Sequence, residues 1–525
     1  RHINQVLDTA LRGSDLDMLD RDALEEQGAG EGIEEGRRVP GSDPQARKIL
    51  AAFVDLDFHG FEGRSVPGCP EPGEAFDNFL VDPCRGLPPG FFVSFSQQVE
   101  HVRQVRPEFL GPEFKGEIRT DRARKTIDDL SGPASPGRVR KGVTRENLEP
   151  RSGQKAGEQR EKARRIEGEI IESDRPGETI LLFRQPIGVI GGILPWNFPF
   201  FLIARKAAPA LVAGNTIVIK PSEETPHNAV KFAEIVAEVG MPAGLINIVH
   251  GRGPTAGQAL ASSRRIGMVS FTGSVETGSA IMAAAAPNIT KVNLELGGKA
   301  PAIVMADADM ELAVRAVKAS RVLNSGQVCN CAERVYVQRS VAQAFTERLA
   351  EAMRQTRFGD PLADPTVDYG PLINEAGFRK VDRLVRSALE SGAELVTGGK
   401  RGPDERGYYY EPTVLAGCRQ QMEIIRRETF GPVVPVVTFE DLDEAIAYAN
   451  DSDYGLTSSI YTRDLNVALR ACQEIRFGET YINRENFEAM QGFHAGWRKS
   501  GIGGADGKHG LYEYLQTHVV YLQRY

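Results

Sequence analysis

The stretch "TIVIKPSEETPHNAVKFAEIVAEVGMPAGLINIVHG", residues 216–251, decides the fold class. Its first five residues are mostly branched and apolar, which predicts a buried strand. The next segment, 225–240, repeats apolar side chains at helical spacing and stops at Gly240, which predicts a helix. "INIVHG" then predicts a second strand. A strand–helix–strand unit of this kind is typical of a parallel sheet with helices packed on it.

The same alternation continues on both sides of this unit. Strands are predicted at "IGMVSFTG" and "KVNLEL", and a second series begins near Pro301 with "PAIVM", "RVYVQ", "PVVPVVTF", "GLTSSIYT" and "ETYIN". The uncharged stretch 187–204 is long enough for a membrane helix. Pro195, Asn197 and Pro199 interrupt it, so we predict a buried strand, a loop and a helix start, and no membrane association.

Composition narrows the class of partner. The 525 residues carry a net charge of −8 with both signs interspersed, and no Lys/Arg stripe with interleaved aromatics is visible, so we expect a small molecule and no nucleic acid. Six cysteines at irregular spacings do not form a disulfide framework. Acidic residues throughout the first 26 positions argue against a secretory or transit peptide. We therefore expect a reducing, cytoplasmic location.

Polar residues follow two of the predicted strands, where an open parallel sheet binds its ligands. Lys220, Ser222 and Glu223 come directly after "TIVI". A carboxylate there suits the two hydroxyls of a ribose and would repel a 2′-phosphate, which favours NAD over NADP. Gly273 and Ser274 open a helix whose free N–H groups could face a phosphate. The alternatives are a solvated loop capped by Ser222 and an ordinary tight turn.

The motif "LELGGK" places Glu295 between an apolar strand and two glycines. Burial of such a carboxyl group should raise its pKa toward the range useful to a general base. The alternative is a surface acid at the end of a strand.

The segment "NSGQVCNCAERV", residues 324–335, contains two cysteines one residue apart. Cys329 follows Gly326–Gln327, where we expect a helix to give way to a loop that could expose it, and Cys331 would face the opposite way in an extended segment. Neither His nor further Cys lies at metal-ligand spacing, so no metal site is expected. A buried structural thiol stays open as an alternative for either residue.

The motif "PWNFP" holds Asn197 between two aromatic rings and two prolines. A rigid amide donor of this kind stabilises an oxyanion when it points at a carbonyl group under attack. A thiol, an amide donor, a carboxylate base and an NAD site together suit the oxidation of an aldehyde.

These motifs, with "ETFGPVVPV", "NDSDYGLTSSIYT" and "SGIGGADGKHGL", resemble the aldehyde dehydrogenase superfamily in their order and spacing. The resemblance runs from about Arg164 to the C-terminus and is strongest to the members that act on lactaldehyde and glycolaldehyde. It implies an α/β fold with a Rossmann-type NAD domain, an α/β catalytic domain and a small β oligomerisation flap. Residues 1–160 do not resemble the family's opening.

The resemblance also implies a role for individual residues. Cys329 would be the nucleophile, Glu295 the general base, and Asn197 with the Cys329 N–H the oxyanion hole. The cofactor site would comprise Leu194, Trp196, Lys220, Ser222, Glu223, Gln258, Gly273, Ser274, Glu428 and Phe430. The substrate site would comprise Arg205, Asn330, Glu488 and His494. Many relatives carry a proton-relaying Glu at the position of Ala505; here Asp506 follows that alanine, so the relay is missing or rerouted.

The implied activity is NAD-dependent oxidation of a small hydroxyaldehyde, such as lactaldehyde or glycolaldehyde, through a thiohemiacetal and a thioester on cysteine. The alternatives are a CoA-acylating semialdehyde dehydrogenase and a catalytically impaired or structural member of the fold. The implied assembly is a homotetramer built as a dimer of dimers. The expected divisions are an atypical Pro/Gly-rich region (1–160), an oligomerisation hairpin (161–186), an NAD domain (187–297), a catalytic domain (298–500) and a C-terminal oligomerisation segment (501–525).

Overall fold

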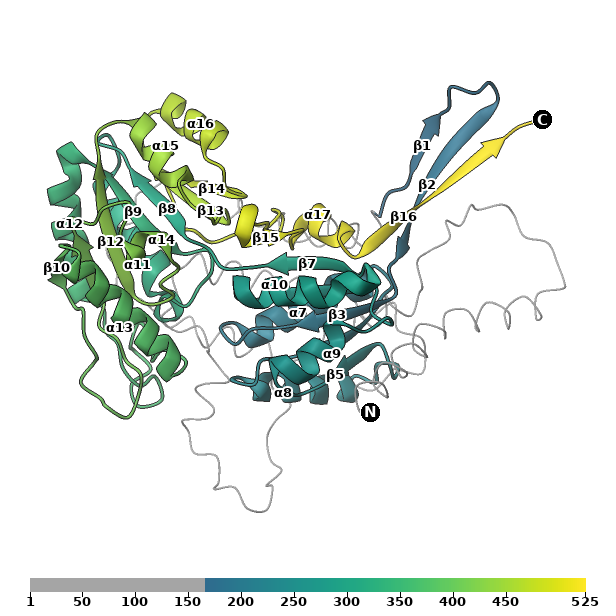
Figure 1. Ribbon diagram of the computed structural model, residues 1–525, viewed down its shortest axis with the longest axis horizontal. Coiled ribbons are helices and arrows are strands. Elements are labelled where there is room, and N and C mark those ends of the chain that lie inside the picture. Colours follow the sequence, from purple (N-terminus) through teal and green to yellow (C-terminus); the bar gives the residue numbers. More distant parts are fainter. Residues whose placement is uncertain (1–165) are drawn as a thin grey trace, which may run out of the picture.

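The computed structural model describes residues 166–525. The atypical region expected at 1–160, and the first residues of the hairpin expected at 161–186, therefore lie outside the described residues. Three β-sheets organise the described part of the chain: two lie in the body of the molecule, and a narrow third sheet projects from it (Figure 1).

The first body sheet has six strands in the order β15-β7-β6-β3-β4-β5. All neighbours are parallel except β15, which runs antiparallel to β7. Buried branched side chains line the central strands, as the sequence pattern predicted. The strands are β3 (Val189–Ile193), β4 (Thr216–Lys220), β5 (Ile246–Ile248), β6 (Met268–Thr272), β7 (Lys291–Glu295) and β15 (Gly501–Ile502).

Helices cover both faces of this sheet. Neighbouring residues on one strand face opposite sides, so Ile190 packs with α7 and α8 while Val189 packs with α9 and α10. Pro199 starts α7, where a missing N–H costs nothing. The helices are α7 (Pro199–Val212), α8 (Pro226–Glu238), α9 (Gln258–Ala261) and α10 (Val275–Ala285).

The second body sheet has seven strands in the order β10-β11-β12-β9-β8-β13-β14, parallel except for the edge strand β10. These strands are β8 (Ala300–Val304), β9 (Ala332–Gln338), β10 (Glu394–Thr397), β11 (Thr413–Ala416), β12 (Val433–Phe439), β13 (Thr457–Tyr461) and β14 (Glu479–Ile482).

One face of the second sheet packs against α11 (Met310–Val322) and α12 (Arg339–Arg354). The other face packs against α13 (Glu375–Glu390), α14 (Glu423–Arg426), α15 (Leu442–Asn450) and α16 (Leu465–Glu474). The short helix α17 (Gly507–Tyr512) lies between the body and the C-terminal strand (Figure 1).

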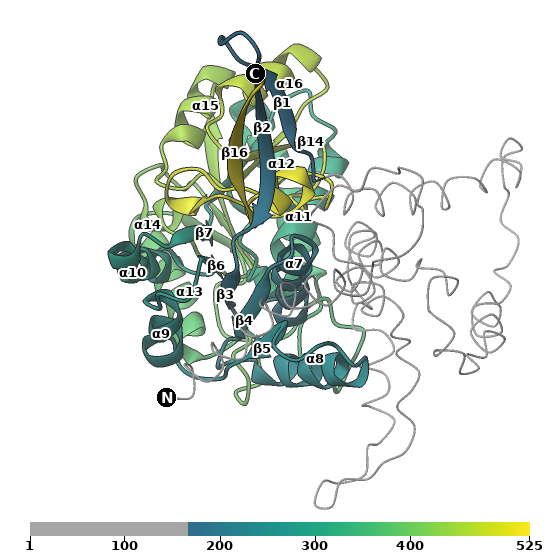
Figure 2. The same ribbon diagram turned by 90° about the vertical axis from the view of Figure 1, so that its right-hand side faces the viewer.

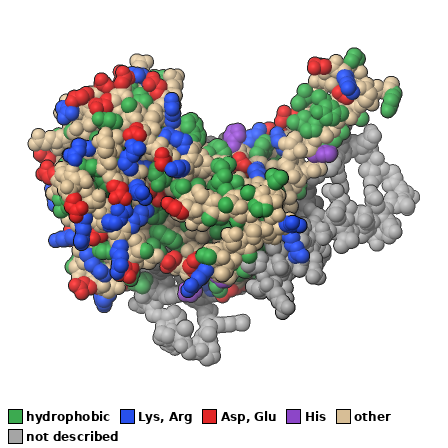
Figure 3. Space-filling model, in the orientation of Figure 1, with side chains coloured by type: hydrophobic (Ala, Val, Ile, Leu, Met, Phe, Trp, Pro, Cys, Tyr) green, Lys and Arg blue, Asp and Glu red, His purple; other side chains and the backbone are tan. Residues whose placement is uncertain are grey.

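The projecting sheet, here called the flap, consists of β1 (Glu169–Glu172), β2 (Glu178–Pro186) and the C-terminal strand β16 (Leu515–Gln523). Both β1 and β16 pair antiparallel with β2, and Figure 2 shows the three strands side by side above the first body sheet. Apolar side chains gather on the flap (Figure 3), where Ile170 and Tyr521 are 80% and 66% exposed.

The predicted α/β fold is confirmed. The regular strand–helix alternation occurs where the sequence indicated it, and the uncharged stretch 187–204 forms β3, a loop and the start of α7. Among residues 166–525, no helix is both long and apolar enough to cross a bilayer.

Candidate active site

The segment that carries the two cysteines leaves α11 through a strained turn, Leu323–Gly326. Asn324 and Ser325 both adopt left-handed backbone angles, with φ of 48° and 59°, which is uncommon for residues other than glycine. Gly326 continues the turn at φ 73°, and a Cβ at this position would lie 2.3 Å from the carbonyl oxygen of Gly431. The turn is therefore held by close backbone packing, and strain of this kind is concentrated at functional sites.

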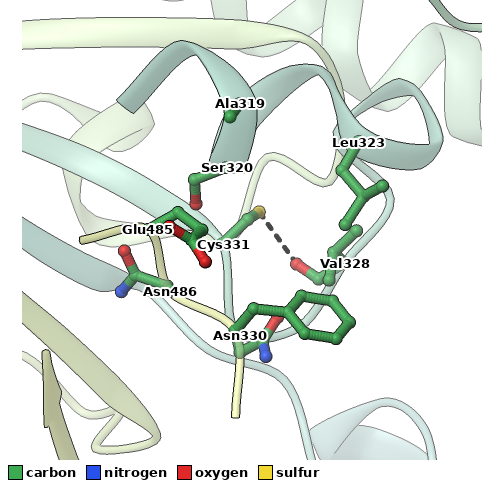
Figure 4. Close-up of a pocket in the computed structure, with 9 residues that line it drawn as sticks. Ala319, Ser320, Leu323, Val328, Asn330, Cys331, Glu485 and Asn486 are labelled. Atoms are coloured by element: carbon green, nitrogen blue, oxygen red, sulfur yellow. Dashed lines mark hydrogen bonds between the residues drawn. The ribbon is translucent and has the colours of Figure 1, made fainter. Parts of the chain in front are cut away.

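The two thiols have different surroundings. Cys329 is half-buried. The thiol of Cys331 is buried and donates to the carbonyl of Val328 at 2.9 Å (Figure 4). It also accepts a hydrogen bond from the guanidinium of Arg321 at 2.8 Å. Burial raises the pKa of Cys331 to about 12, despite the nearby guanidinium. Cys331 is thus an inert structural thiol at neutral pH, and Cys329 is the accessible one.

Cys331 also lines a small cavity between α11 and the loop 485–487, with room for about one water molecule. Figure 4 shows Asn330 beside it and Glu485 and Asn486 opposite. Cys329 does not line this cavity.

Asn197 lies against the cysteine segment. Its side-chain nitrogen donates to the backbone carbonyl of Gln327 at 3.0 Å. Its backbone carbonyl accepts a bond from the side-chain nitrogen of Asn324, also at 3.0 Å. The amide group has a second N–H. The structure therefore fixes the Asn197 side chain against the backbone of Gln327, which lies two residues before Cys329 in the chain.

Glu295 ends β7 and is 4% exposed, so the predicted burial is confirmed. Its carboxylate accepts a bond from the hydroxyl of Thr272 at 3.3 Å. The predicted rise in pKa is wrong. Burial by itself would raise the pKa of Glu295, but the positive charges of Lys206, Arg205 and His494 outweigh it and hold the pKa below its ordinary value.

Three of the four residues expected on the substrate side meet at Glu488, and the fourth, His494, interacts with it electrostatically. Arg205 pairs with Glu488 at 3.1 Å, and the amide of Asn330 donates to the other oxygen of Glu488 at 2.5 Å. His494 is 2% exposed, and Glu488 influences its charge directly. The nitrogen Nε of Arg205 and the oxygen Oδ1 of Asn330 are buried without a partner among the described residues.

His494 links this cluster to Cys329. Its Nδ1 lies 2.5 Å from Glu479, and its side chain is in hydrogen-bonding contact with Cys329. Burial would lower the pKa of His494, but Glu488 and Glu479 raise it well above its ordinary value. The site therefore places an imidazolium next to Cys329.

The sequence reasoning gave no role to three further residues at this centre. Lys206 is buried, donates to Ser270 at 3.0 Å and is the strongest positive influence on Glu295. Asp506 forms an ion pair with Arg205, and Glu479 orients His494. A signal existed for Lys206, because "ARKAA" puts two adjacent cations inside an otherwise apolar helix.

Asp506 has an unusual environment for an acid. It adopts φ 65°, its side chain is 4% exposed, and burial raises its pKa although Arg205 opposes the shift. Asp506, the residue after Ala505, therefore adds a carboxyl group to the cluster through its ion pair with Arg205.

The residues expected to hold the adenosine ribose lie at the end of β4. Lys220 is buried and its ammonium group lies 2.7 Å from the half-exposed carboxylate of Glu223. Burial opposes ionisation of Glu223, but the bond from Lys220, with backbone hydrogen bonds, holds its pKa below the ordinary value. Ser222 is buried, and its hydroxyl accepts the N–H of Glu224 at 3.2 Å. An ionised acid next to a buried cation fits a ribose diol.

The first turn of α10 was expected to receive a phosphate. Ser274 is its N-cap, and its hydroxyl accepts the N–H of Thr277 at 3.2 Å, with Gly273 directly before it. Gln258 is exposed and begins α9, after a π-helical turn, Gly253–Gly257. A Cβ added at Gly253 would meet nothing within 4 Å. Open space therefore lies next to the loop that carries Gln258.

The residues expected on the nicotinamide side converge from three segments. Glu428 accepts the N–H of Gly298 at 3.0 Å, and burial raises the pKa of its carboxyl group. The ring of Phe430 meets Trp196 edge to face, with centroids 5.7 Å apart, and Leu194 is buried close by in the chain. A Cβ at Gly298 would lie 2.3 Å from the carbonyl oxygen of Cys329, so glycine allows the two segments to touch.

We predict that iodoacetamide alkylates Cys329 in the native protein and leaves Cys331 unmodified. The exposed Cys472 serves as the internal positive control. The physical reason is that burial keeps Cys331 protonated and inaccessible, whereas Cys329 is reachable and lies beside a cation. Peptide mass spectrometry after a time course gives both rates. Alkylation of Cys331 as fast as that of Cys472 would contradict the distinction.

Comparison with known proteins agrees with this geometry. The sequence model that describes the aldehyde dehydrogenase family matches residues 150–520 of this chain. Lactaldehyde dehydrogenase of Escherichia coli strain K12 is 66% identical over 361 residues, or 69% of this chain and 75% of that protein. The 3,6-anhydro-alpha-L-galactose dehydrogenase of Vibrio sp. strain EJY3 is 46% identical over 363 residues, covering 69% and 75%.

Solved structures show the same likeness. The crystal structure of E. coli lactaldehyde dehydrogenase has a TM-score of 0.68, 66% identity, and coverage of 69% of this chain and 76% of that chain. A betaine aldehyde dehydrogenase from Staphylococcus aureus in complex with NAD+ has a TM-score of 0.67 at 38% identity, covering 69% and 72%. The chain belongs to the aldehyde dehydrogenase family.

Proposed function

We propose that this protein oxidises a small hydroxyaldehyde to its carboxylic acid, with NAD as the hydride acceptor. The observation that supports the proposal is the set of groups around the cysteine segment. The Asn197 amide bonds to Gln327, two residues before Cys329. His494, which interacts with Cys329, also acts on the buried charges of Glu295 and Glu488. The similarity to the E. coli enzyme named lactaldehyde dehydrogenase supports this choice of substrate class.

In the first half of the reaction, the Cys329 thiolate adds to the carbonyl carbon of the aldehyde. The negative charge that develops on the carbonyl oxygen is stabilised by the free N–H of Asn197 and the backbone N–H of Cys329. NAD, when bound, would supply the hydride acceptor for the resulting thiohemiacetal. Loss of the hydride restores the carbonyl group and leaves a thioester on Cys329.

In the second half, Glu295 removes a proton from a water molecule that attacks the thioester, and Cys329 leaves as a thiolate. Because Lys206, Arg205 and His494 hold the pKa of Glu295 below its ordinary value, the base is already ionised at neutral pH. The same charges weaken it as a base, so proximity to the thioester must contribute much of the acceleration.

The substrate class follows from unsatisfied polar groups. Burying a donor or acceptor without a partner is costly, and here Arg205 Nε and Asn330 Oδ1 are both in that state within one cluster. A hydroxyl group next to the carbonyl can donate to one and accept from the other. An aldehyde that lacks this hydroxyl would leave Arg205 Nε and Asn330 Oδ1 without partners. A site of this kind discriminates strongly against the substrate that lacks the hydroxyl.

The residues present fit NAD. Glu223 would accept the adenosine ribose hydroxyls beside Lys220, the first turn of α10 with Ser274 would face the pyrophosphate, and Glu428 would hold the second ribose. The carboxylate at position 223 is ionised, so it would repel a 2′-phosphate.

We also assign a role to each part of the described chain. Residues 187–297 would bind NAD, residues 298–500 would supply the nucleophile, and the flap would join protomers in a homotetramer. Exposed apolar side chains on a projecting sheet support this role for the flap. Cys329, Cys331, Cys418 and Cys472 are all free, which suits a reducing compartment such as the cytoplasm.

Glu295→Gln tests the reaction directly. We expect the steady-state kcat with lactaldehyde to fall by about 10²–10⁴-fold, because the variant cannot deprotonate the hydrolytic water. A burst of NADH should remain, because the thioester still forms. Stopped-flow absorbance separates the burst from turnover.

The exposed Glu238→Gln, in α8, is the matched control and should behave as the native enzyme. Full steady-state activity in Glu295→Gln would remove the base assignment. NADH formation by the native protein that required added coenzyme A would instead identify a CoA-acylating dehydrogenase.

The role of the flap is tested by the double variant Ile170→Lys with Tyr521→Lys. Two charges on the apolar surface should lower the mass measured by light scattering from that of a tetramer to that of a smaller species. Leu465→Lys places the same charge on another exposed apolar residue, in α16, and should leave the mass unchanged. A monomeric native protein, or a tetrameric double variant, would contradict this assembly.

A further inference from the structure

Glu333, the second residue of β9, lies four residues after Cys329 and is 1% exposed. Its carboxylate receives four donors. Lys299 lies 2.5 Å from Oε2 and Arg321 lies 2.8 Å from Oε1. The backbone N–H groups of Thr429 and Phe430 donate to Oε2 and Oε1 at 2.9 and 3.0 Å. Both carboxylate oxygens are thus fully used.

These partners come from the segments that carry the proposed chemistry. Lys299 follows the two glycines after Glu295, and it also donates to the hydroxyl of Thr429 at 3.2 Å. Arg321 comes from α11 and also donates to the carbonyl of Gly431 and to Cys331. One buried carboxylate therefore joins the cysteine segment, the glycine segment after the base, and the turn at 428–431.

The turn at 428–431 has a backbone conformation that its surroundings must fix. Phe430 adopts a left-handed backbone conformation, φ 58°, which is unfavourable for a bulky side chain. Its ring meets Trp196 edge to face and lies 6.0 Å from the ammonium group of Lys380. The N–H groups on both sides of the Thr429–Phe430 bond point at Glu333 and not at another backbone carbonyl. A conformation of this kind persists when its surroundings fix it.

The carboxyl group of Glu333 is ionised at neutral pH. Burial would raise its pKa, but Arg321 and Lys299 outweigh that effect and lower the pKa to about 2. Burial lowers the pKa of Lys299 to about 8, against the attraction of Glu333. An amide at position 333 would offer one acceptor oxygen where the structure uses two, and would leave two buried cations without an anion.

We propose that Glu333 is a positioning residue that fixes the Glu428–Phe430 turn, and through it the nicotinamide side of the cofactor cleft. This inference rests on the proposed function, in which Glu428 holds the second ribose of NAD. Glu333 touches neither cofactor nor substrate in this scheme; it acts through the backbone of Thr429 and Phe430.

The test uses Glu333→Gln in a Trp497→Phe background. The chain has two tryptophans, so this background leaves Trp196 as the reporter on its contact with Phe430. We expect acrylamide to quench Trp196 fluorescence more strongly in Glu333→Gln without any cofactor, because the ring of Phe430 no longer covers it. We expect KM for NAD to rise about tenfold through misplacement of Glu428. KM for the aldehyde should change by less than about twofold.

Two variants separate positioning from general loss of stability. Leu349→Ala removes a fully buried side chain from α12, away from the turn, and should leave quenching and KM for NAD at native values. Glu333→Asp keeps the charge that Lys299 and Arg321 need but shortens the reach to the turn, so it should fold and still raise KM for NAD.

A Glu333→Asp variant with native quenching and native KM for NAD would overturn the proposal, even if Glu333→Gln does not fold. Leu349→Ala with the same changes as Glu333→Gln would overturn it as well. Glu428→Gln serves as the reference for the cofactor assignment. If Glu428→Gln leaves KM for NAD unchanged, the proposed function fails at this residue. If it raises KM and the Glu333 variants do not, positioning by Glu333 is wrong.

Discussion

The contact between the Glu333 carboxylate and its four donors is the constraint on which the site depends. Residues far apart in the sequence meet there: β9 after the cysteines, the glycine turn after Glu295, and the turn after Glu428. Removing one partner of a buried ion pair typically costs about 3–5 kcal/mol, because the other charge is left uncompensated. Local backbone preferences oppose the left-handed turns at Asn324 and Phe430, so tertiary contacts must hold them.

A second principle governs the reacting end of the site, where buried charges are balanced. Glu295, Glu488 and Asp506 face Arg205, Lys206 and His494 inside a volume from which water is largely excluded. Each group moves the pKa of its neighbours. The result is an ionised base, a protonated imidazole beside the thiol and a guanidinium held by two carboxylates. This arrangement attracts polar substrates and penalises apolar ones.

Much of the fold could be predicted from the sequence because local signals agree with each other. Buried branched strands, amphipathic helices and glycine stops alternate regularly between residues 187 and 482, and the structure follows them. The burial of Glu295 and the opposite orientation of Cys331 were also indicated by local sequence, whereas the choice between Cys329 and Cys331 as the buried thiol needed the structure.

The pKa of Glu295 could not be predicted in the same way. Its direction is set by Lys206 and Arg205 from α7 and by His494 from the C-terminal part of the chain, and no local pattern places these next to β7. The same holds for Glu333, whose sequence context "NCAERV" resembles the start of an ordinary strand. Its role becomes visible only when Thr429 and Phe430 are seen to donate to it.

The most direct measurement is to trap the covalent intermediate. Glu295→Gln mixed with NAD and lactaldehyde, quenched with acid within the first turnover and digested, should yield the Cys329 peptide with the mass of the lactoyl group added. The peptide should lose that mass on treatment with hydroxylamine, as a thioester does. NADH formed in equal amount with an unmodified Cys329, or with the acyl group on another residue, would contradict the central role given to this sulfur.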